Sequence, residues 1–220
     1  MTCAYLIPGC TTDPVEIEIK RSRFIGYLAY ADNEDDARDF ISTIRSSHRD
    51  ARHVCHAFTC SPRQTIQRSS DDGEPAGTAG MPILKALVAR RHGSFHISDT
   101  VLTVVRYFGG IKLGAGGLVQ AYSETAVATL DATPFKLRKH MALLSIYADY
   151  QMAARLETIL RSHYQVADVI YHADRVEIIV CIDDSDESIA DARQQIAQLS
   201  AGQAYVECKN SCWVDSPLPS

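Results

Sequence analysis

The chain has 220 residues, a mass of 24.3 kDa and a formal net charge of −5. Since an average domain has about 150 residues, this length suggests two small domains. Apolar residues make up 46% and charged residues 22%, ordinary values for a globular protein that exclude a disordered or fibrous chain. The negative charge excludes a protein that binds nucleic acid by bulk positive charge, although it permits a local basic site.

The seven cysteines do not show the spacing of a zinc ribbon. The first residues, MTCAYLIPGCTTDP, lack a basic start followed by an apolar stretch, and no apolar run is long enough for a membrane span. We therefore expect a cytoplasmic protein with reduced thiols, no membrane contact, no cofactor and no resident metal.

Hydrophobic periodicity predicts the elements of the first half of the chain. Apolar and charged residues alternate at the start of the first strand, and acids followed by Arg45 suit the dipole of the first helix. The expected elements, in chain order, are a strand over 15–31 interrupted at 22–26, a helix from Asn33, strands over 53–60 and 65–67, a helix capped by Thr78 or Gly80, a strand over 100–107 and a helix over 118–130.

The second half predicts the order strand, helix, strand, strand, helix, strand, which is typical of a ferredoxin-like fold. The strands are expected over 141–150, 166–172, 175–182 and from 204, and the helices over 151–163 and 186–199. A break in the pattern at 133–139 suggests domains at 1–135 and 136–220. The first holds 14 basic and 15 acidic residues and the second 8 and 12, so the acidity belongs mainly to the second domain.

Two glycine-rich loops, at 71–80 and 109–117, each run into a predicted helix. Free backbone N–H groups and the helix dipole favour an anion at such a position. Arg106 and Lys112 flank the second loop and suit a phosphate or carboxylate. The sequence therefore suggests an anion or nucleic-acid site formed by Arg106, Lys112, Gly109, Gly110, Gly114, Gly116, Gly117, Thr78 and Gly80. The alternative is two tight turns that need glycine for their backbone.

Acidic and nucleophilic residues suggest two further chemistries. Asp71, Asp72 and Glu74 are suited to hold a divalent cation for hydrolysis or phosphoryl transfer, or else to bond backbone amides and Arg106. His53 and Cys55 share one face of a predicted strand, as a nucleophile and base would, although a packed core pair is the commoner arrangement.

Three long segments, KRSRFIG (20–26), DDGEPAGTAGMPIL (71–84) and VVRYFGGIKLGAGGLVQAY (104–122), resemble the IMPACT family and its bacterial, YigZ-like members. The resemblance implies a first domain akin to domain 2 of ribosomal protein S5 and a second like domain V of elongation factor G. It also implicates a signature acidic loop of Asp71, Asp72, Gly73, Glu74 and Gly77, in addition to the anion-site residues above.

The resemblance implies a role in translation or its regulation, since eukaryotic members act in translational control. The sequence thus favours an α+β protein of two domains that binds RNA, the ribosome or another phosphate-bearing ligand. The metal-assisted enzyme is the alternative, and a protein partner bound through the acidic second domain is a third hypothesis.

Overall fold

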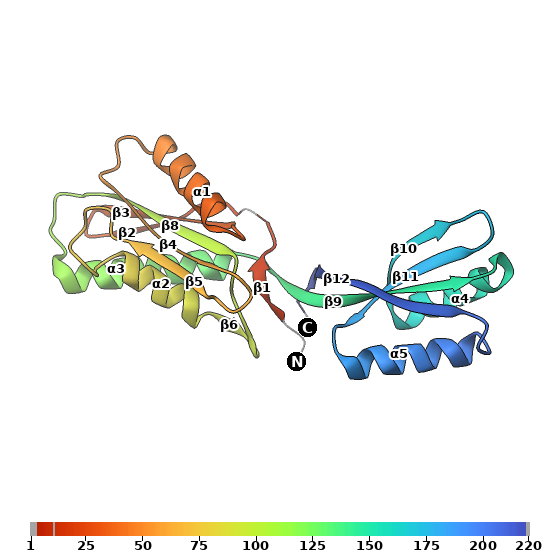
Figure 1. Ribbon diagram of the computed structural model, residues 1–220. Helices are drawn as coiled ribbons and strands as arrows, with labels where there is room; N and C mark the ends of the chain where they lie inside the picture. Colours follow the sequence, from red (N-terminus) through yellow and green to blue (C-terminus); the bar gives the residue numbers. More distant parts are fainter. Residues whose placement is uncertain (1–3, 11, 219–220) are drawn as a thin grey trace. The chain divides into compact units, whose positions relative to one another are not determined.

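The computed structural model describes residues 4–10 and 12–218, which divide into two compact units (Figure 1). One is built mainly from residues 5–137 and the other mainly from 138–215. Both combine antiparallel sheet with helices, which confirms the predicted α+β class.

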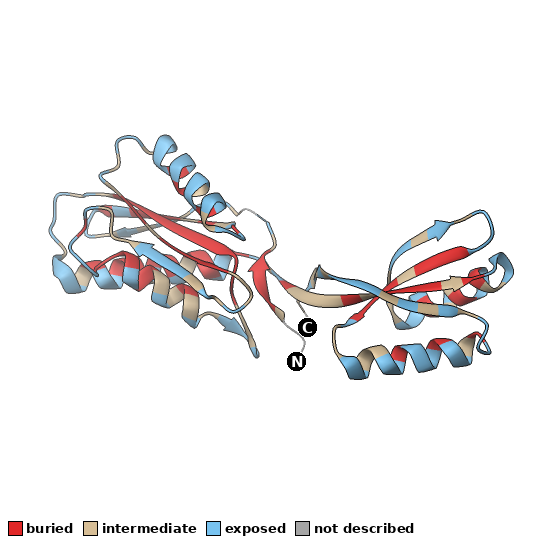
Figure 2. Ribbon diagram, viewed as in Figure 1, coloured by how far each residue is buried: buried red, intermediate tan, exposed pale blue. Residues whose placement is uncertain are grey.

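A five-stranded antiparallel sheet forms the first unit, in the order β2-β3-β8-β4-β5. The elements in this part of the chain, in sequence order, are β1 (Ala4–Pro8), β2 (Val15–Ile19), β3 (Ser22–Tyr30), α1 (Glu34–Ser47), β4 (His53–Cys60), β5 (Ile66–Ser70), α2 (Gly80–Ala89), β6 (Arg91–His92), β7 (Phe95–His96), β8 (Thr100–Tyr107) and α3 (Gly114–Ala132). Strand β8 is buried along nearly its whole length, as its β-branched sequence predicts (Figure 2).

Helix α1 covers one face of this sheet, and α2 and α3 cover the other (Figure 1). On the α1 face Ile44 packs with Val54 and Val105. On the opposite face the Phe24 ring meets Tyr122 of α3 edge to face, with their centroids 5.2 Å apart. Gly26 allows the close approach of α3, because a Cβ there would lie 1.9 Å from Thr129 Oγ1.

Strand register brings the start of β3, the start of β4 and the end of β8 to one end of the sheet. Arg23 is paired with Tyr107 across β3 and β8, and His53 with Arg106 across β4 and β8. Loops that leave these strand ends therefore meet there, although their residues lie far apart in the sequence.

The second unit has the predicted βαββαβ order. Its elements are β9 (Phe135–Ala148), α4 (Tyr150–His163), β10 (Gln165–Tyr171), β11 (Val176–Asp183), α5 (Asp186–Leu199) and β12 (Tyr205–Pro217). Its five-stranded sheet has the order β1-β9-β11-β10, and β12 also pairs with β9. The order β12-β9-β11-β10 within it is that of a ferredoxin-like fold, and Ile146, Leu156 and Ile196 join β9, α4 and α5 in one core.

Three expectations about element ends were wrong. Helix α3 begins at Gly114 rather than Leu118, so the glycines from 114 to 117 form its first turn. Helix α2 has Ala79 rather than Thr78 or Gly80 as its N-cap residue, and the Thr78 hydroxyl donates to the Pro75 carbonyl. Residues 135–139, expected to break the pattern, are the start of β9. Strands β1, β6 and β7 were not predicted.

Candidate functional site

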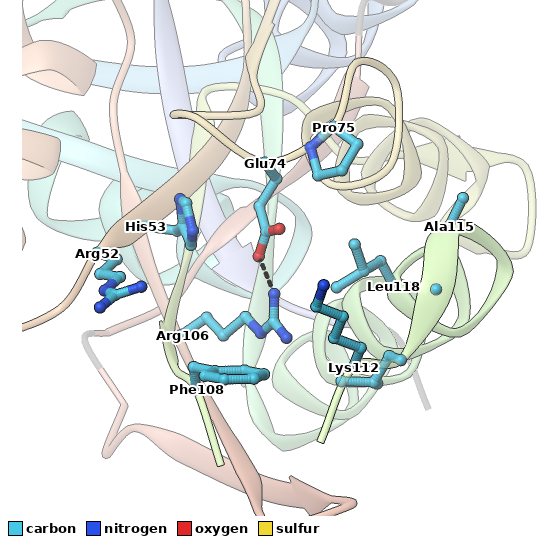
Figure 3. A pocket seen from close by; sticks show the side chains of 11 residues that line it. Arg52, His53, Glu74, Pro75, Arg106, Phe108, Lys112, Ala115 and Leu118 are labelled. Carbon is cyan, nitrogen blue, oxygen red and sulfur yellow. Dashed lines mark hydrogen bonds and ion pairs between the residues drawn. The ribbon is translucent and has the colours of Figure 1, made fainter. Parts of the chain in front are cut away.

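A pocket of about 380 Å³ lies at the end of the first sheet where β8 ends and α3 begins (Figure 3). Its polar lining comes from Arg52, His53, Glu74, Arg106 and Lys112, and its apolar lining includes Pro75, Phe108, Leu113 and Leu118. The pocket is within the size range of small-ligand sites, and its mixture of apolar walls and few polar groups is typical of them.

Arg106 was expected to bind an external anion, but in the structure it is paired with the Glu74 carboxylate of the same chain. Its Nη1 donates to Glu74 Oε1 at 2.6 Å, and the two side chains are only 8% and 3% exposed. The guanidinium lies between the rings of Phe24 and Phe108, at 5.5 and 5.6 Å from their centroids. The Nε of Arg106 is buried and has no hydrogen-bond partner among the described residues. A buried guanidinium that is only partly satisfied thus lines the pocket.

A chain of hydrogen bonds continues from this pair into the core. The Tyr122 hydroxyl donates to Glu74 Oε1 at 2.9 Å, and the Cys55 thiol lies 3.3 Å from the same hydroxyl. Burial is the largest influence on both groups: it raises the pKa of Tyr122 far above its usual range and that of Cys55 to about 12. Both groups are therefore neutral at physiological pH.

His53 and Cys55 do not form a nucleophile and base pair. Nδ1 of His53 lies 2.8 Å from the Asp72 carbonyl, which can only accept, so this nitrogen carries a proton and donates it to that carbonyl. The Cys55 thiol lies 3.0 Å from the Asp71 carbonyl instead. Since the cysteine is also protonated, the structure agrees with the packed arrangement of these residues.

The Asp71 carboxylate occupies the N-terminus of α2. Its Oδ1 accepts from the amides of Ala79 at 3.0 Å and Gly80 at 2.8 Å, and its Oδ2 accepts from the Gly77 amide at 2.8 Å. Burial alone raises the pKa of Asp71, but these three backbone donors outweigh it and lower the pKa below its usual value. The amides that we expected an external anion to use in the first loop are therefore filled by the chain's own carboxylate.

Other residues of the first loop also have structural partners. Asp72 accepts from the Val54 amide at 2.6 Å and pairs with Arg45 at 2.8 Å. Gly73 and Gly77 have backbone φ values of +85° and +75°, which residues other than glycine rarely adopt. Gly80 permits close packing, because a Cβ there would lie 2.7 Å from the backbone of Ser70. These bonds match the alternative in which the acids hold the loop together.

The carboxylates at 71, 72 and 74 are bonded to protein donors rather than grouped around a shared point. Among residues 4–10 and 12–218, no three His, Cys, Asp or Glu side chains are placed to hold one metal ion. The donor set that a metal-assisted reaction needs is thus not formed by this loop.

The second glycine loop is different, because no described protein group fills the start of the helix that follows it. The N-cap residue Leu113 makes no side-chain cap bond, and the first turn of α3 has no acidic residue. Gly114 adopts φ of +73°, and no described atom lies within 4 Å of a Cβ built on Gly114 or Gly116. The N–H groups at the start of α3 are thus accessible beside the pocket.

The remaining glycines of this loop shape the backbone. Gly109 packs against β3, since a Cβ there would lie 2.0 Å from the backbone of Arg21. Gly110 has φ of +87°, and a Cβ on Gly117 would lie 3.0 Å from Leu113. Of the predicted anion-site residues, Lys112 and Gly114 at the N-terminus of α3 both line the pocket and are exposed. Figure 3 shows the Lys112 side chain pointing into the pocket.

Four cations gather at this end of the sheet, although Arg52 and Lys112 lie far from Lys20 and Arg21 in the sequence. Arg52 and Lys112 line the pocket, and Lys20 and Arg21 form the turn from β2 to β3 that packs against Gly109. All four are exposed, and no carboxylate in the described part of the chain forms an ion pair with them. The end of the sheet is therefore locally positive.

Sequence reasoning did not identify Phe108 or Tyr122 as site residues, and it considered His53 only as a partner of Cys55. Phe108 directly follows Tyr107 at the end of β8 and is 49% exposed. Its position two residues from Arg106 was the available signal, since both flank the second glycine loop. Tyr122 carried no sequence signal apart from its helical spacing with Leu118.

Comparisons with known proteins cover both halves of the chain. A family model described as the Impact N-terminal domain matches residues 20–130. The chain is 38% identical to IMPACT family member YvyE of Bacillus subtilis over 171 residues, 78% of this chain and 76% of that protein. It is 35% identical to an IMPACT family member of Haemophilus influenzae over 205 residues, 92% and 96% of the two chains.

A solved structure of a hypothetical protein matches with a TM-score of 0.60 and 32% identity, over 96% of this chain and 98% of the other. In the described residues, no helix has the length and apolar character needed to span a membrane. The family match, the full-length relatives and the shared fold show that the chain belongs to the IMPACT family.

Proposed function

We propose that this protein binds a phosphate-bearing ligand, RNA or the ribosome first among them, through the pocket at the start of α3. A role in translation or its regulation accords with the sequence resemblance described above. The ligand contacts are assigned to Lys112, Arg52 and the first-turn amides of α3, with Arg106 as the buried floor of the pocket.

The contrast between the two glycine loops carries the proposal. Both lead into a helix with no acidic residue in its first turn, yet three amides of the first receive the Asp71 carboxylate, whereas no side chain in the described part of the chain accepts from the first-turn amides of α3. The first loop is therefore an example, within the same chain, of a glycine-rich turn at a helix N-terminus that binds a negatively charged group. The second loop offers the equivalent donors to an anion from outside.

The local charge supports the same conclusion. Among the described residues that line the pocket, Glu74 is the one carboxylate, and its charge is offset by Arg106. Arg52 and Lys112 then leave the site positive, even though the whole chain has a net charge of −5. Cations that are not held in an ion pair bind phosphate without first breaking one.

The test is RNA affinity as a function of salt concentration, measured for Arg52→Gln with Lys112→Gln. We expect the double variant to bind more weakly at low salt, with a log–log salt slope smaller by about 0.7 for each single-strand phosphate that the protein no longer neutralises. The control is Lys85→Gln with Arg193→Gln, which removes the same charge at positions outside the pocket. Equal affinity and slope in the two double variants would contradict the proposal. Arg106 is not replaced here, because its loss would leave Glu74 buried without its cation.

A further inference from the structure

Phe108 is a large apolar side chain at the rim of a positively charged pocket. It is 49% exposed, unlike the buried residues that precede it in β8 (Figure 2). The Arg106 guanidinium lies 5.6 Å from the centroid of its ring, within cation–π distance. A half-exposed aromatic ring beside cations is typical of a surface on which bases stack.

We infer that the pocket takes one nucleotide of a single-stranded nucleic acid, with its base stacked on Phe108 and its phosphate at Lys112 and the N-terminus of α3. This inference rests on the proposed function and adds the class of ligand. The volume of about 380 Å³ and the apolar side chains of Pro75, Leu113 and Leu118 suit a base, whereas inorganic phosphate needs neither.

Arg106 supplies an observation that is independent of the helix N-terminus. Its side chain is only 8% exposed, and it lines the pocket with its Nε lacking a hydrogen-bond partner in the described residues. Glu74 satisfies only one side of the guanidinium. A planar cation in this position suits contact with the oxygen atoms or the π-face of a nucleotide.

The cations outside the pocket argue for a strand longer than one nucleotide. Lys20 and Arg21 have left-handed backbone φ values of 47° and 65° in the turn that packs against Gly109. This places two exposed cations beside the pocket loop, with Arg52 just before β4 on the other side of β8. A chain of phosphates has contacts available on both sides of Phe108, whereas a free nucleotide uses only one.

A duplex does not satisfy the same geometry. Bases within a duplex are stacked on one another, so their faces cannot reach a ring on a protein surface. Single strands present unstacked bases, and aromatic contact of this kind is tolerant of sequence. The site therefore distinguishes single strands from duplexes by stacking, while its cations bind the phosphates of either.

The experiment measures fluorescence anisotropy of a labelled 12-nucleotide oligouridine, the matching DNA strand and a 12-base-pair RNA duplex. We expect single strands to bind at least about tenfold more tightly than the duplex, and Phe108→Leu to weaken single-strand binding about tenfold with an unchanged salt slope. Phe108→Trp should retain affinity and show quenching of its added fluorescence on binding. The control is Tyr171→Leu, which removes a tyrosine that is 67% exposed in the second unit.

The outcomes separate the two proposals. If Phe108→Leu binds like the wild type, or the duplex binds as tightly as single strands, the stacking inference is overturned while the phosphate site stands. If Phe108→Leu has a lower melting temperature than the wild type, its weaker binding could reflect unfolding, and the fluorescence of Phe108→Trp is used as the test instead. Absence of quenching on binding would then overturn the stacking inference. If none of the three nucleic acids binds, both proposals fall. Equal binding of the RNA and DNA strands supports stacking and assigns no role to the 2′-hydroxyl.

Discussion

Arg106 donates to Glu74 at 2.6 Å with both side chains buried, so strand β8 is joined to the first glycine loop by a desolvated ion pair. The pair is neutral as a whole and forms the floor of the pocket, where the Nε of Arg106 has no hydrogen-bond partner among the described residues. The cations that remain for a ligand are Arg52 and Lys112.

Removing one partner of this pair is expected to be costly. Glu74→Gln leaves the Arg106 charge buried without compensation, and we expect the free energy of unfolding to fall by about 3–5 kcal/mol. Urea denaturation followed by circular dichroism measures the change. The double variant Glu74→Gln with Arg106→Met should lie closer to the wild type than either single variant. Additive losses in the double variant would show that the two side chains are not coupled.

Asp71 should make stability depend on pH. Because its pKa is lower in the folded protein than in the unfolded chain, it stabilises the fold fully above the unfolded value, and this stability is lost as the pH falls through the folded pKa. Asp71→Asn should cost about 1–2 kcal/mol at neutral pH and flatten the acid limb below about pH 4. Thermal unfolding of the wild type and of Asp71→Asn at acid and neutral pH tests this. If the melting temperatures of the two proteins changed with pH in parallel, Asp71 would not be stabilising the N-terminus of α2.

Glu177 predicts acid sensitivity of the second unit. Burial raises its pKa, but bonds from Lys209, Ser145 and His172 outweigh this and lower the pKa to about 2. Its stabilising effect is therefore present above the usual carboxyl range and is lost as the pH falls from about 4.5 toward 2. Amide exchange should show β11 losing protection in this interval in the wild type. In Glu177→Gln, protection should already be lower at neutral pH and change little on acidification.

Cys55 should be inert in the folded protein. Burial raises its pKa to about 12, so almost no thiolate is present at neutral pH, whereas Cys10 is exposed. Iodoacetamide followed by peptide mass spectrometry should label Cys10 first and Cys55 only in denaturant. Rapid labelling of Cys55 under native conditions would show that the pocket opens into the core.

Much of the fold could be predicted because hydrophobic periodicity marks its elements clearly. Strands 53–60 and 100–107 and the helix at 186–199 have the bounds expected from their patterns. The start of α3 was misplaced because glycines were interpreted as loop, although an uncapped helix can begin at a glycine with positive φ. Local pattern does not report such a beginning.

The site was only partly predictable, for a physical reason. Composition marked both glycine loops equally, but only three-dimensional contacts show that Asp71 fills the first while the second has no carboxylate in its first turn. Likewise, Arg52 and Lys112 line the same pocket because β4 is paired with β8, and their separation in the sequence carries no information about that. Arg106 was singled out from the sequence as a ligand for an external anion, and the structure pairs it with the buried Glu74.

The most direct measurement is a ¹H–¹⁵N NMR titration of the protein with inorganic phosphate, observing the amides of both glycine loops. We expect saturable shifts of the Ala115, Gly116 and Gly117 amides at the start of α3, weakened in Lys112→Gln, because no carboxylate of the first turn occupies these donors. The Gly77 and Gly80 amides should not shift, since Asp71 already holds them. Unchanged α3 amides, or equal shifts in both loops, would contradict an anion site at the second loop.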